Sequence, residues 1–540
     1  MEFFNYNNIH LHIAIILSVV NGVLMCFAGS KLLQIIQLSG YKISGYRAWL
    51  KDTKVKYIGR LAILSFLSIA CVVVTNALLD GYGEYYSYVG LIFYFYFTIV
   101  FIVNMYRVPQ KTPLKQTKRM TRLMTVTFLL MAGITLGLIA LFSEYVWFVK
   151  FGIVAITPIF LPVVVPIAHL LMVPIEELIR QIYVIKAKNK LKKYPNLIKI
   201  GITGSFGKTT TKHFLNVILS KKYKVCMSPH SFNTPMGLTK VILKYLKPEH
   251  EVLIAEMGAR QLGDISYLCK MVKPKHAIIT AVGNQHLATF GSKENIAKEK
   301  NQLAKAISDG IVAFNSNNQG AMNLYQNCDK QKIACGLDGE NNFANITNIK
   351  ITPQGSEFDL TIENKTVSCK TKLLGKHNLQ DIALSCGIAY KMGLKLSEIK
   401  SAIATLKPIP HRLELIHENG ITILDNSFNS SVESTTAAIE TLALFENDKI
   451  VVTPGLVELG QTEYEENQRM GEQLALVATK VVIVNKVNKE AITKGLLIGG
   501  FNEENILFAE DLEQAKNLLS TIIKNGDVVL FQNDLPDNYT

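Results

Sequence analysis

Long apolar runs dominate the first third of the chain. Five of them approach the roughly 20 residues that a helix needs to cross a bilayer, and they cover about residues 9–36, 57–79, 86–106, 123–142 and 146–175. The last run contains prolines at positions 158, 162, 166 and 174, so we expect a kinked or broken helix there. The pattern predicts an α-helical membrane region over residues 1–176 with about five transmembrane helices.

Shorter apolar segments follow, in an order typical of α/β domains. Strand-like segments at 197–203, 252–255 and 276–282 have the continuous apolar character of buried parallel strands, and 212–219 is helix-like. Residues 177–196 are interpreted as a basic linker and 197–408 as a central α/β domain.

A second alternation begins after a proline-containing linker at 408–412. Strand-like segments at 421–424, 450–452, 481–484 and 527–531 alternate with helix-like segments at 434–445, 464–477 and 512–524. We therefore predict a smaller, doubly wound, Rossmann-like carboxy-terminal domain over residues 409–540.

Charge is distributed unevenly between the two parts. The formal net charge of +14 suggests a nucleic-acid binder when taken alone. Residues 1–200 carry 21 Lys and Arg against 7 Asp and Glu, whereas residues 201–540 carry 36 of each. A mean hydropathy of +0.21 and this segregation exclude a uniformly basic soluble protein, so we expect no nucleic-acid partner.

The basic residues follow the predicted loops. Lys and Arg gather between the first and second runs, between the third and fourth, and after the fifth, while the other short loops hold Asp80, Glu84 and Glu144. Since cytoplasmic loops retain Lys and Arg, we expect an external amino terminus, a multi-pass cell-membrane protein and cytoplasmic domains beyond residue 176. The basic loops set the topology, or in addition hold anionic lipid headgroups or an anionic lipid-linked substrate.

The eight cysteines show no C-x-x-C pair and no zinc-ligand spacing. We expect reduced, buried thiols facing a cytosol.

A glycine-rich turn joins the first strand of the central domain to its helix. The turn comprises Gly204, Ser205, Phe206, Gly207, Lys208, Thr209 and Thr210. Strand, glycine-rich turn, Lys-Thr and helix are the context of a phosphate loop, in which backbone N–H groups bind phosphate, Lys reaches the terminal phosphates and Thr offers a hydroxyl to Mg²⁺. The first glycine of the standard pattern is replaced by Ile202.

Two further strands end in candidate metal ligands. Glu256 ends the strand at 252–255, and His286 follows the strand at 276–282. A carboxylate at the carboxyl end of a neighbouring strand is where an open α/β sheet would hold Mg²⁺.

These segments resemble the Mur ligase family of ATP-dependent amide ligases, with the type that adds D-alanyl-D-alanine fitting best. The resembling segments are TGSFGKTTTK, EMGARQLGDISYL and VGNQHLATFGS, within residues 197–540. The resemblance implies Lys208 on the phosphates, Thr209 and Glu256 on one magnesium, and His286 on a second. It also places Lys300 where many members carry a carbamylated lysine that bridges magnesium; a solvated helix lysine is the alternative.

Further segments extend the resemblance. In LLGKHNLQDIALSCGIA, His377 and Asn378 match the G-x-H-N-x-x-N segment that holds adenine, although its last Asn is Asp381 here. PHRLELI and ILDNSFNSS resemble the hinge arginine and the aspartate segment, which implies Arg412 on a phosphate, Asp425 on the nucleotide or hinge, and Asn429 as a weaker candidate. Where the family has a histidine after PGLVELG, this chain has Asn467, and its FQNDLPDNY end lacks a Lys-Gly-Ser-Arg-like segment.

We therefore expect an ATP- and Mg²⁺-dependent peptide ligase that acts through an acyl phosphate and adds D-alanyl-D-alanine, or a similar amino acid or dipeptide, to a cell-wall peptide precursor. The chain leaves no room between the fifth apolar run and the phosphate loop for the family's UDP-binding domain. The acceptor is then UDP-linked, lipid-linked or a poly-γ-glutamate-like polymer. An ATP-driven transporter or sensor, or a nonreacting membrane scaffold, remains the alternative from another class.

Overall fold

The computed structural model describes residues 6–53, 57–78, 87–107, 113–142, 147–229, 231–283, 287–428, 430–457 and 459–534. The chain divides into two compact units, with residues 1–181 in the first and 182–535 in the second. Each unit has its own hydrophobic core.

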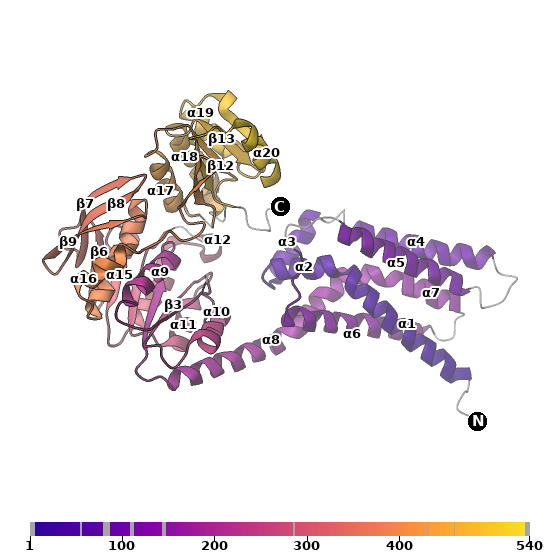
Figure 1. Cartoon of the computed structure of the whole chain (residues 1–540). Helices are drawn as coiled ribbons and strands as arrows, with labels where there is room; N and C mark the ends of the chain where they lie inside the picture. Colours follow the sequence, from indigo (N-terminus) through magenta and orange to yellow (C-terminus); the bar gives the residue numbers. More distant parts are fainter. Residues whose placement is uncertain are drawn as a thin grey trace. The chain divides into compact units, whose positions relative to one another are not determined.

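The first unit is helical (Figure 1). Its elements are α1 (Tyr6–Ala28), α2 (Ser30–Leu38), α3 (Ile43–Thr53), α4 (Tyr57–Leu78), α5 (Ser87–Arg107), α6 (Lys118–Leu141), α7 (Trp147–Ile156), a 3₁₀ helix (Thr157–Phe160) and the start of α8 (Leu161–Lys192). Among the described residues, five helical segments are long and apolar enough to cross a membrane, which agrees with the predicted number.

The first and fifth apolar runs are each interrupted. The first run divides at Gly29 into α1 and α2, and a Cβ at Gly29 would lie 3.2 Å from the Leu161 side chain. The fifth run breaks at the 3₁₀ helix that contains Pro158, as the prolines predicted, and α8 then continues past Pro166 and Pro174.

Buried polar side chains connect the helices of this unit. Asn21 Nδ2 donates 2.9 Å hydrogen bonds to Thr135 Oγ1 and Thr157 Oγ1, and Asn21 Oδ1 accepts one from Tyr94. One amide thus ties α1, α5, α6 and the 3₁₀ break together, so the polar atoms satisfy one another inside the bundle.

The second unit begins inside helix α8. Val184, Ala187 and Leu191 of α8 lie in the same core as Leu238, Val241 and Leu253. Lys190 Nζ donates to the carbonyl oxygens of Leu243 and Leu246, at 3.1 and 2.7 Å. The stretch interpreted from sequence as a linker at 177–196 is therefore helical up to Lys192, and its apolar face packs in the domain core.

The middle part of the second unit is a nine-stranded sheet in the order β2-β3-β1-β4-β5-β6-β7-β8-β9. Its strands are β1 (Ile198–Thr203), β2 (Val225–Met227), β3 (Val252–Glu256), β4 (His276–Ile279), β5 (Val312–Asn315), β6 (Lys332–Leu337), β7 (Ala344–Thr352), β8 (Gly355–Ile362) and β9 (Lys365–Thr371). The strands from β2 to β7 pair in parallel, and β7, β8 and β9 pair antiparallel.

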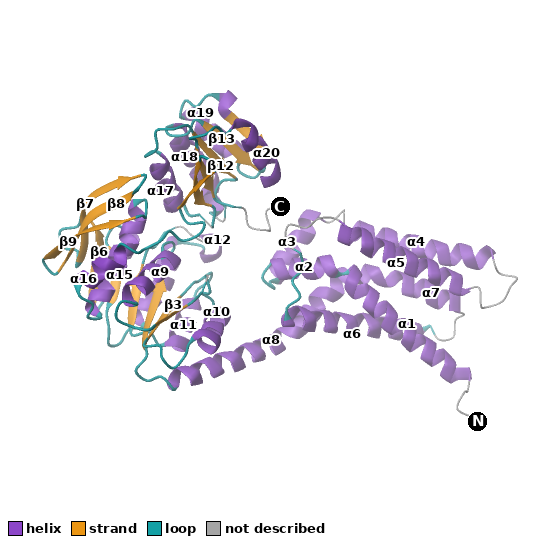
Figure 2. Cartoon of the chain, in the orientation of Figure 1, coloured by secondary structure: helices purple, strands orange, loops and turns teal. Residues whose placement is uncertain are grey.

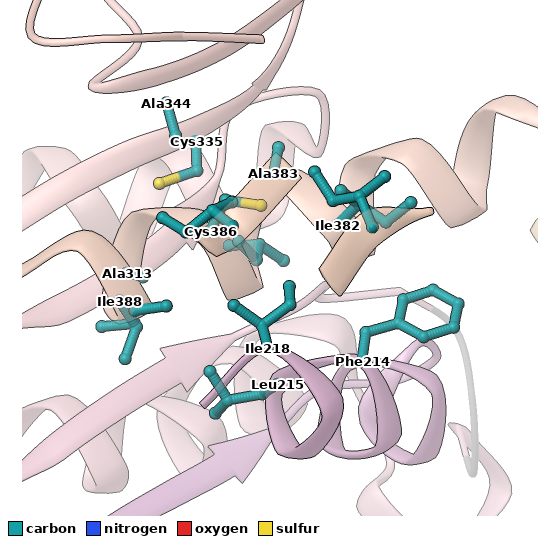
Figure 3. Packing of buried hydrophobic residues seen from close by; sticks show 14 of the residues in the cluster. Phe214, Leu215, Ile218, Ala313, Cys335, Ala344, Ile382, Ala383, Cys386 and Ile388 are labelled. Carbon is teal, nitrogen blue, oxygen red and sulfur yellow. The ribbon is translucent and has the colours of Figure 1, made fainter. Parts of the chain in front are cut away.

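Helices cover this sheet (Figure 2). They are α9 (Lys208–Leu219), α10 (Pro235–Lys240), a π-helical turn (Val241–Tyr245), α11 (Asp264–Val272), α12 (Leu287–Phe290), α13 (Lys293–Lys305), α14 (Gln319–Gln326), α15 (Lys376–Lys391) and α16 (Leu396–Ile403). Helices α9 and α15 share one core, in which Phe214, Leu215 and Ile218 lie near Ile382 and Cys386 (Figure 3). The helix after the phosphate loop is thus fixed against α15.

The carboxy-terminal part has a six-stranded sheet in the order β10-β11-β15-β12-β13-β14, parallel except for β10. Its strands are β10 (Glu414–Glu418), β11 (Ile421–Asn426), β12 (Lys449–Thr453), β13 (Lys480–Val484), β14 (Ile506–Ala509) and β15 (Val528–Gln532). Its helices are α17 (Val432–Leu442), α18 (Glu463–Ala475), α19 (Lys489–Ile498) and α20 (Leu512–Ile522). This is the doubly wound domain that the sequence predicted.

The eight cysteines are all free, and every one except Cys71 is buried. Burial raises the pKa of the Cys335 thiol to about 12. These thiols behave as apolar core groups.

Candidate nucleotide and metal site

The glycine-rich turn lies between β1 and α9, as predicted. Gly207 has φ of 78°, a left-handed conformation that favours glycine, and it directly precedes the first residue of α9. Ser205 N–H donates to the Ala281 carbonyl at 2.8 Å, and Ser205 Oγ accepts from Gly283 N–H at 2.9 Å. The segment after β4 therefore braces the loop, and the amino-terminal N–H groups of α9 face the place where a phosphate would bind.

Lys208 bends back onto this loop. Its Nζ donates to the carbonyl oxygens of Gly204 and Ser205, at 2.6 and 3.1 Å. Burial lowers the pKa of Lys208 to about 8; nearby Glu256 opposes the shift and Arg412 adds to it. The ammonium is thus held over the loop by backbone dipoles.

Glu256 ends β3 and is 1% exposed. Its Oε1 accepts hydrogen bonds from Thr209 Oγ1 at 3.1 Å and from Asn233 Nδ2 at 3.2 Å. Its Oε2 accepts one from Lys212 Nζ at 3.1 Å. The carboxylate and the hydroxyl that the sequence assigned to one magnesium are therefore in direct contact.

Lys300 lies on α13 and is 5% exposed. Burial and the positive charge of Lys208 lower its pKa well below the usual value, against the effect of Glu299. The interpretation as a solvated helix lysine is wrong, because this side chain is enclosed.

Arg412 reaches this site from the carboxy-terminal part. Its Nη2 lies 3.5 Å from Thr209 Oγ1, and its guanidinium lies 4.9 Å from the centre of the Phe428 ring. Burial lowers its pKa, while Glu256 and Asp381 raise it. Arg412 is half-buried, so it is not a freely solvated surface charge.

Asp425 contacts the hinge. Its Oδ2 is 2.7 Å from His411 Nδ1, and its Oδ1 accepts from Ser427 Oγ at 2.6 Å. Because His411 directly precedes Arg412, Asp425 fixes the segment that presents the guanidinium.

The start of α15 carries the other matched residues. Asn378 Nδ2 donates to the Leu374 carbonyl at 2.7 Å. Burial lowers the pKa of His377 to about 4, and its Nδ1 is buried without a hydrogen-bond partner among the described residues. Asp381 Oδ1 accepts from Thr211 Oγ1 at 2.8 Å, and burial raises the pKa of Asp381 to about 8. A neutral carboxylic acid there can form hydrogen bonds much as the family's amide would.

Two predicted residues, His286 and Asn429, lie outside the described part of the chain. Within that part, no three His, Cys, Asp or Glu side chains gather as a metal site. Conversely, Lys212 and Asn233 bind Glu256 but were not predicted. Lys212 follows a run of threonines in a helix, and Asn233 lies in a loop, so neither has a periodicity or spacing that marks it.

Asn467, which stands where the family has a histidine, holds a loop. Its Oδ1 accepts from Leu456 N–H at 2.8 Å, and its Nδ2 donates to the Leu456 and Glu463 carbonyls at 2.9 and 2.8 Å. Asn488 Nδ2 donates to the Leu456 carbonyl as well, at 3.0 Å. The amide thus fixes the segment after β12.

Comparisons with known proteins agree with this geometry. The model of the Mur ligase middle domain matches residues 202–389, and that of the Mur ligase glutamate ligase domain matches residues 411–532. The UDP-N-acetylmuramoyl-tripeptide--D-alanyl-D-alanine ligase of Escherichia coli is 29% identical over 277 residues, which cover 51% of this chain and 61% of that protein.

The ligase of the same name from Bacillus subtilis is 28% identical to this chain. The matched residues cover 62% of this chain and 72% of the Bacillus subtilis protein. The crystal structure of MurF ligase from Thermotoga maritima in complex with ADP is 27% identical, with a TM-score of 0.58, covering 66% of this chain and 80% of that one. The chain thus spans about three-fifths of the Escherichia coli relative's length. The part of the chain that follows the apolar helices belongs to the Mur ligase family.

Proposed function

We propose that the chain is a membrane-anchored, ATP-dependent amide ligase that adds D-alanyl-D-alanine, or a similar amine, to a cell-wall peptide precursor. One observation carries this proposal. Lys208, Thr209, Glu256 and Arg412 converge from both domains, with 3.1 Å between Thr209 and Glu256 and 3.5 Å between Thr209 and Arg412. The names of the relatives support the D-alanyl-D-alanine substrate.

The surroundings of Glu256 fit magnesium. Mg²⁺ is usually bound by one or two carboxylates together with phosphate oxygens and water, which suits a single buried Glu beside a Thr hydroxyl. Thr209 and Glu256 would hold the ion, and Lys300 would contribute if carbamylated. The ion would neutralise charge on the phosphate oxygens.

The chemistry requires activation of a carboxylate. Transfer of the γ-phosphoryl group from ATP to the peptide carboxylate gives an acyl phosphate and ADP. The amine then attacks the carbonyl carbon, the carbon–oxygen bond to phosphate breaks, and phosphate and a proton are released. Lys208 and the first N–H groups of α9 would stabilise the transferring group, and Arg412 would add positive charge once the domains close.

The apolar helices support membrane anchoring. Five described segments have the length and composition to span a bilayer. The basic loops would then place the ligase domains in the cytoplasm.

The names of the relatives point to a UDP-linked muramoyl-tripeptide as the acceptor. Helix α8 ends at Lys192 and β1 begins at Ile198, so a separate UDP-binding domain does not lie between the apolar helices and the phosphate loop. This observation favours a second candidate, a ligase of the same chemistry whose acceptor is lipid-linked or polymeric. Comparing UDP-muramoyl-tripeptide with a lipid-linked peptide as substrate for the purified full chain would separate the two.

Single-turnover conversion of ATP and substrates by Lys208→Ala tests the reaction. We expect amide formation to fall by at least about a hundredfold, since one group that stabilises developing charge is lost. Lys221→Ala, at an exposed lysine just after α9, is the matched control. Undiminished amide product in Lys208→Ala would overturn the proposal, and ATP turnover that needs neither amine nor carboxylate would favour a transporter or sensor.

A further inference from the structure

Lys212 and Glu256 form a fully buried ion pair within the candidate site. Their side chains are 0% and 1% exposed, and Lys212 Nζ lies 3.1 Å from Glu256 Oε2. Burying an ammonium and a carboxylate costs desolvation free energy that is offset only when the two stay in contact. The two groups are therefore held in one geometry.

The two oxygens of Glu256 have chemically different partners. Oε2 is bound by the Lys212 cation, whereas Oε1 is bound by two neutral donors, the Thr209 hydroxyl and the Asn233 amide. A divalent cation that approaches Oε2 meets the charge of Lys212. At Oε1 no cation among the described side chains is bonded directly to the carboxylate oxygen; the ion meets the Thr209 hydroxyl, which can itself become a ligand, and the Arg412 guanidinium lies beyond that hydroxyl at 3.5 Å.

We propose that Lys212 is a positioning residue that holds Oε2 of Glu256, so that Oε1 is the oxygen left for the divalent cation that accompanies ATP. This inference rests on the proposed function, because it presupposes that the nucleotide brings such a cation. Lys208 and Lys212, four residues apart on α9, then have separate tasks. Lys208 lies on the loop carbonyls and serves the phosphates, whereas Lys212 stays beneath the site with the carboxylate.

Removing the Lys212 charge should weaken cation binding without removing any cation ligand. A buried carboxylate that loses the partner holding one of its oxygens turns toward another donor, and this withdraws Oε1 from the metal. Substitution of groups that orient metal ligands usually costs about tenfold to a hundredfold in metal affinity.

Equilibrium binding of a fluorescent ATP analogue to the detergent-solubilised full chain measures this effect without turnover. The analogue is titrated in EDTA and then with increasing Mg²⁺. For Lys212→Met we expect the affinity for the analogue in EDTA to equal that of the wild type. The Mg²⁺ concentration needed to enhance binding should be about tenfold to hundredfold higher than in the wild type. Lys212→Arg should stay close to wild type, and Lys221→Met, at an exposed lysine, is the control.

A double-mutant cycle with Glu256→Gln separates positioning from general destabilisation. A neutral amide needs no counter-ion, so Lys212→Met should change the Mg²⁺ requirement little in the Glu256→Gln background. Equal effects of Lys212→Met in both backgrounds, or a wild-type Mg²⁺ requirement in Lys212→Met, would overturn the proposal. If Lys212→Met does not fold, Lys212→Gln gives the same comparison with the same two outcomes.

The wild-type titration tests the underlying function independently. If Mg²⁺ does not change nucleotide binding in the wild type, the proposed magnesium–ATP chemistry fails. If Mg²⁺ enhances binding equally in the wild type and Lys212→Met, the role of Lys212 fails and the function stands.

Discussion

Thr211 Oγ1 donates a 2.8 Å hydrogen bond to Asp381 Oδ1 and so joins the helix of the phosphate loop to α15. Asp381 Oδ1 also lies 2.6 Å from the position that a Cβ on Gly207 would occupy. An acidic side chain is thus packed against the glycine-rich loop that we propose binds the phosphates of ATP.

Asp381 should make the ligase unit less stable as pH rises. Burial raises its folded-state pKa to about 8 from a usual value of 3.8. Between these two pH values the unfolded chain has lost a proton that the folded chain retains, so the free energy of unfolding falls with rising pH and levels off above about 8. Asp381→Asn should therefore stabilise the fold by a few kcal/mol more at pH 8 than at pH 5, as an order of magnitude.

Pulse proteolysis of the full chain in urea at both pH values measures this difference. Asp329→Asn, at an aspartate whose side chain is 83% exposed, is the control. A gain for Asp381→Asn that does not depend on pH would contradict the assignment.

Sequence patterns predicted the parts of the fold that carry a local signal. The phosphate loop was predicted because an apolar strand, two glycines, Lys-Thr and a helix occur in succession, and the structure has β1, Gly207 and α9 in that order. The central strands of the carboxy-terminal sheet, such as β12 and β13, are continuous apolar runs and were found within about a residue of their bounds.

Elements defined by tertiary contacts were missed. Strands β7, β8 and β9 alternate buried and exposed side chains at the edge of the sheet and were not assigned. Residues 182–192 contain many lysines, so the sequence pattern does not show that they form a helix with an apolar face. That face is recognised only from its contacts with the domain core. Similarly, Lys212 gains its significance from Glu256, which lies 44 residues away in sequence.

Ligase activity should depend on carbon dioxide through Lys300. Its enclosed amine has a lowered pKa, so a neutral, nucleophilic form is accessible, and reaction with carbon dioxide would give a carbamate. We expect ligase activity to fall in bicarbonate-depleted buffer and to recover when bicarbonate is restored, and isotope-labelled bicarbonate should give a carbamate NMR signal. Lys300→Ala should lose both responses, while a labelled signal that persists in Lys300→Ala would argue against this site.

Gly207→Ala should weaken nucleotide binding through two effects. A φ of 78° costs a residue with a side chain about 1–2 kcal/mol, and the new Cβ would meet Asp381 Oδ1. Gly263→Ala provides a matched control, because Gly263 also precedes a helix with a positive φ of 95° but has no atom within 4 Å of a Cβ. Titration with labelled ATP should show a clear loss for Gly207→Ala alone; equal binding by both variants would refute the role of the close contact.

Asn467→Ala should loosen the segment after β12. It leaves the buried Leu456 N–H without its partner, which costs about 1–3 kcal/mol. Hydrogen exchange followed by mass spectrometry should show faster exchange in residues 454–457, with Glu465→Ala, exposed on the same helix, as the reference. Unchanged exchange in that segment would show that Asn488 alone suffices to hold it.

The buried cysteines have a practical consequence for observing domain closure. With seven of eight native thiols buried and the eighth, Cys71, half-buried, maleimide reagents should find few reactive positions on the folded chain. A cysteine introduced at Leu476, which is 81% exposed on the carboxy-terminal domain, should therefore be labelled selectively. Paired with a second introduced site on the middle domain, it would report the distance between the two domains by resonance energy transfer during turnover, with the native cysteines left in place.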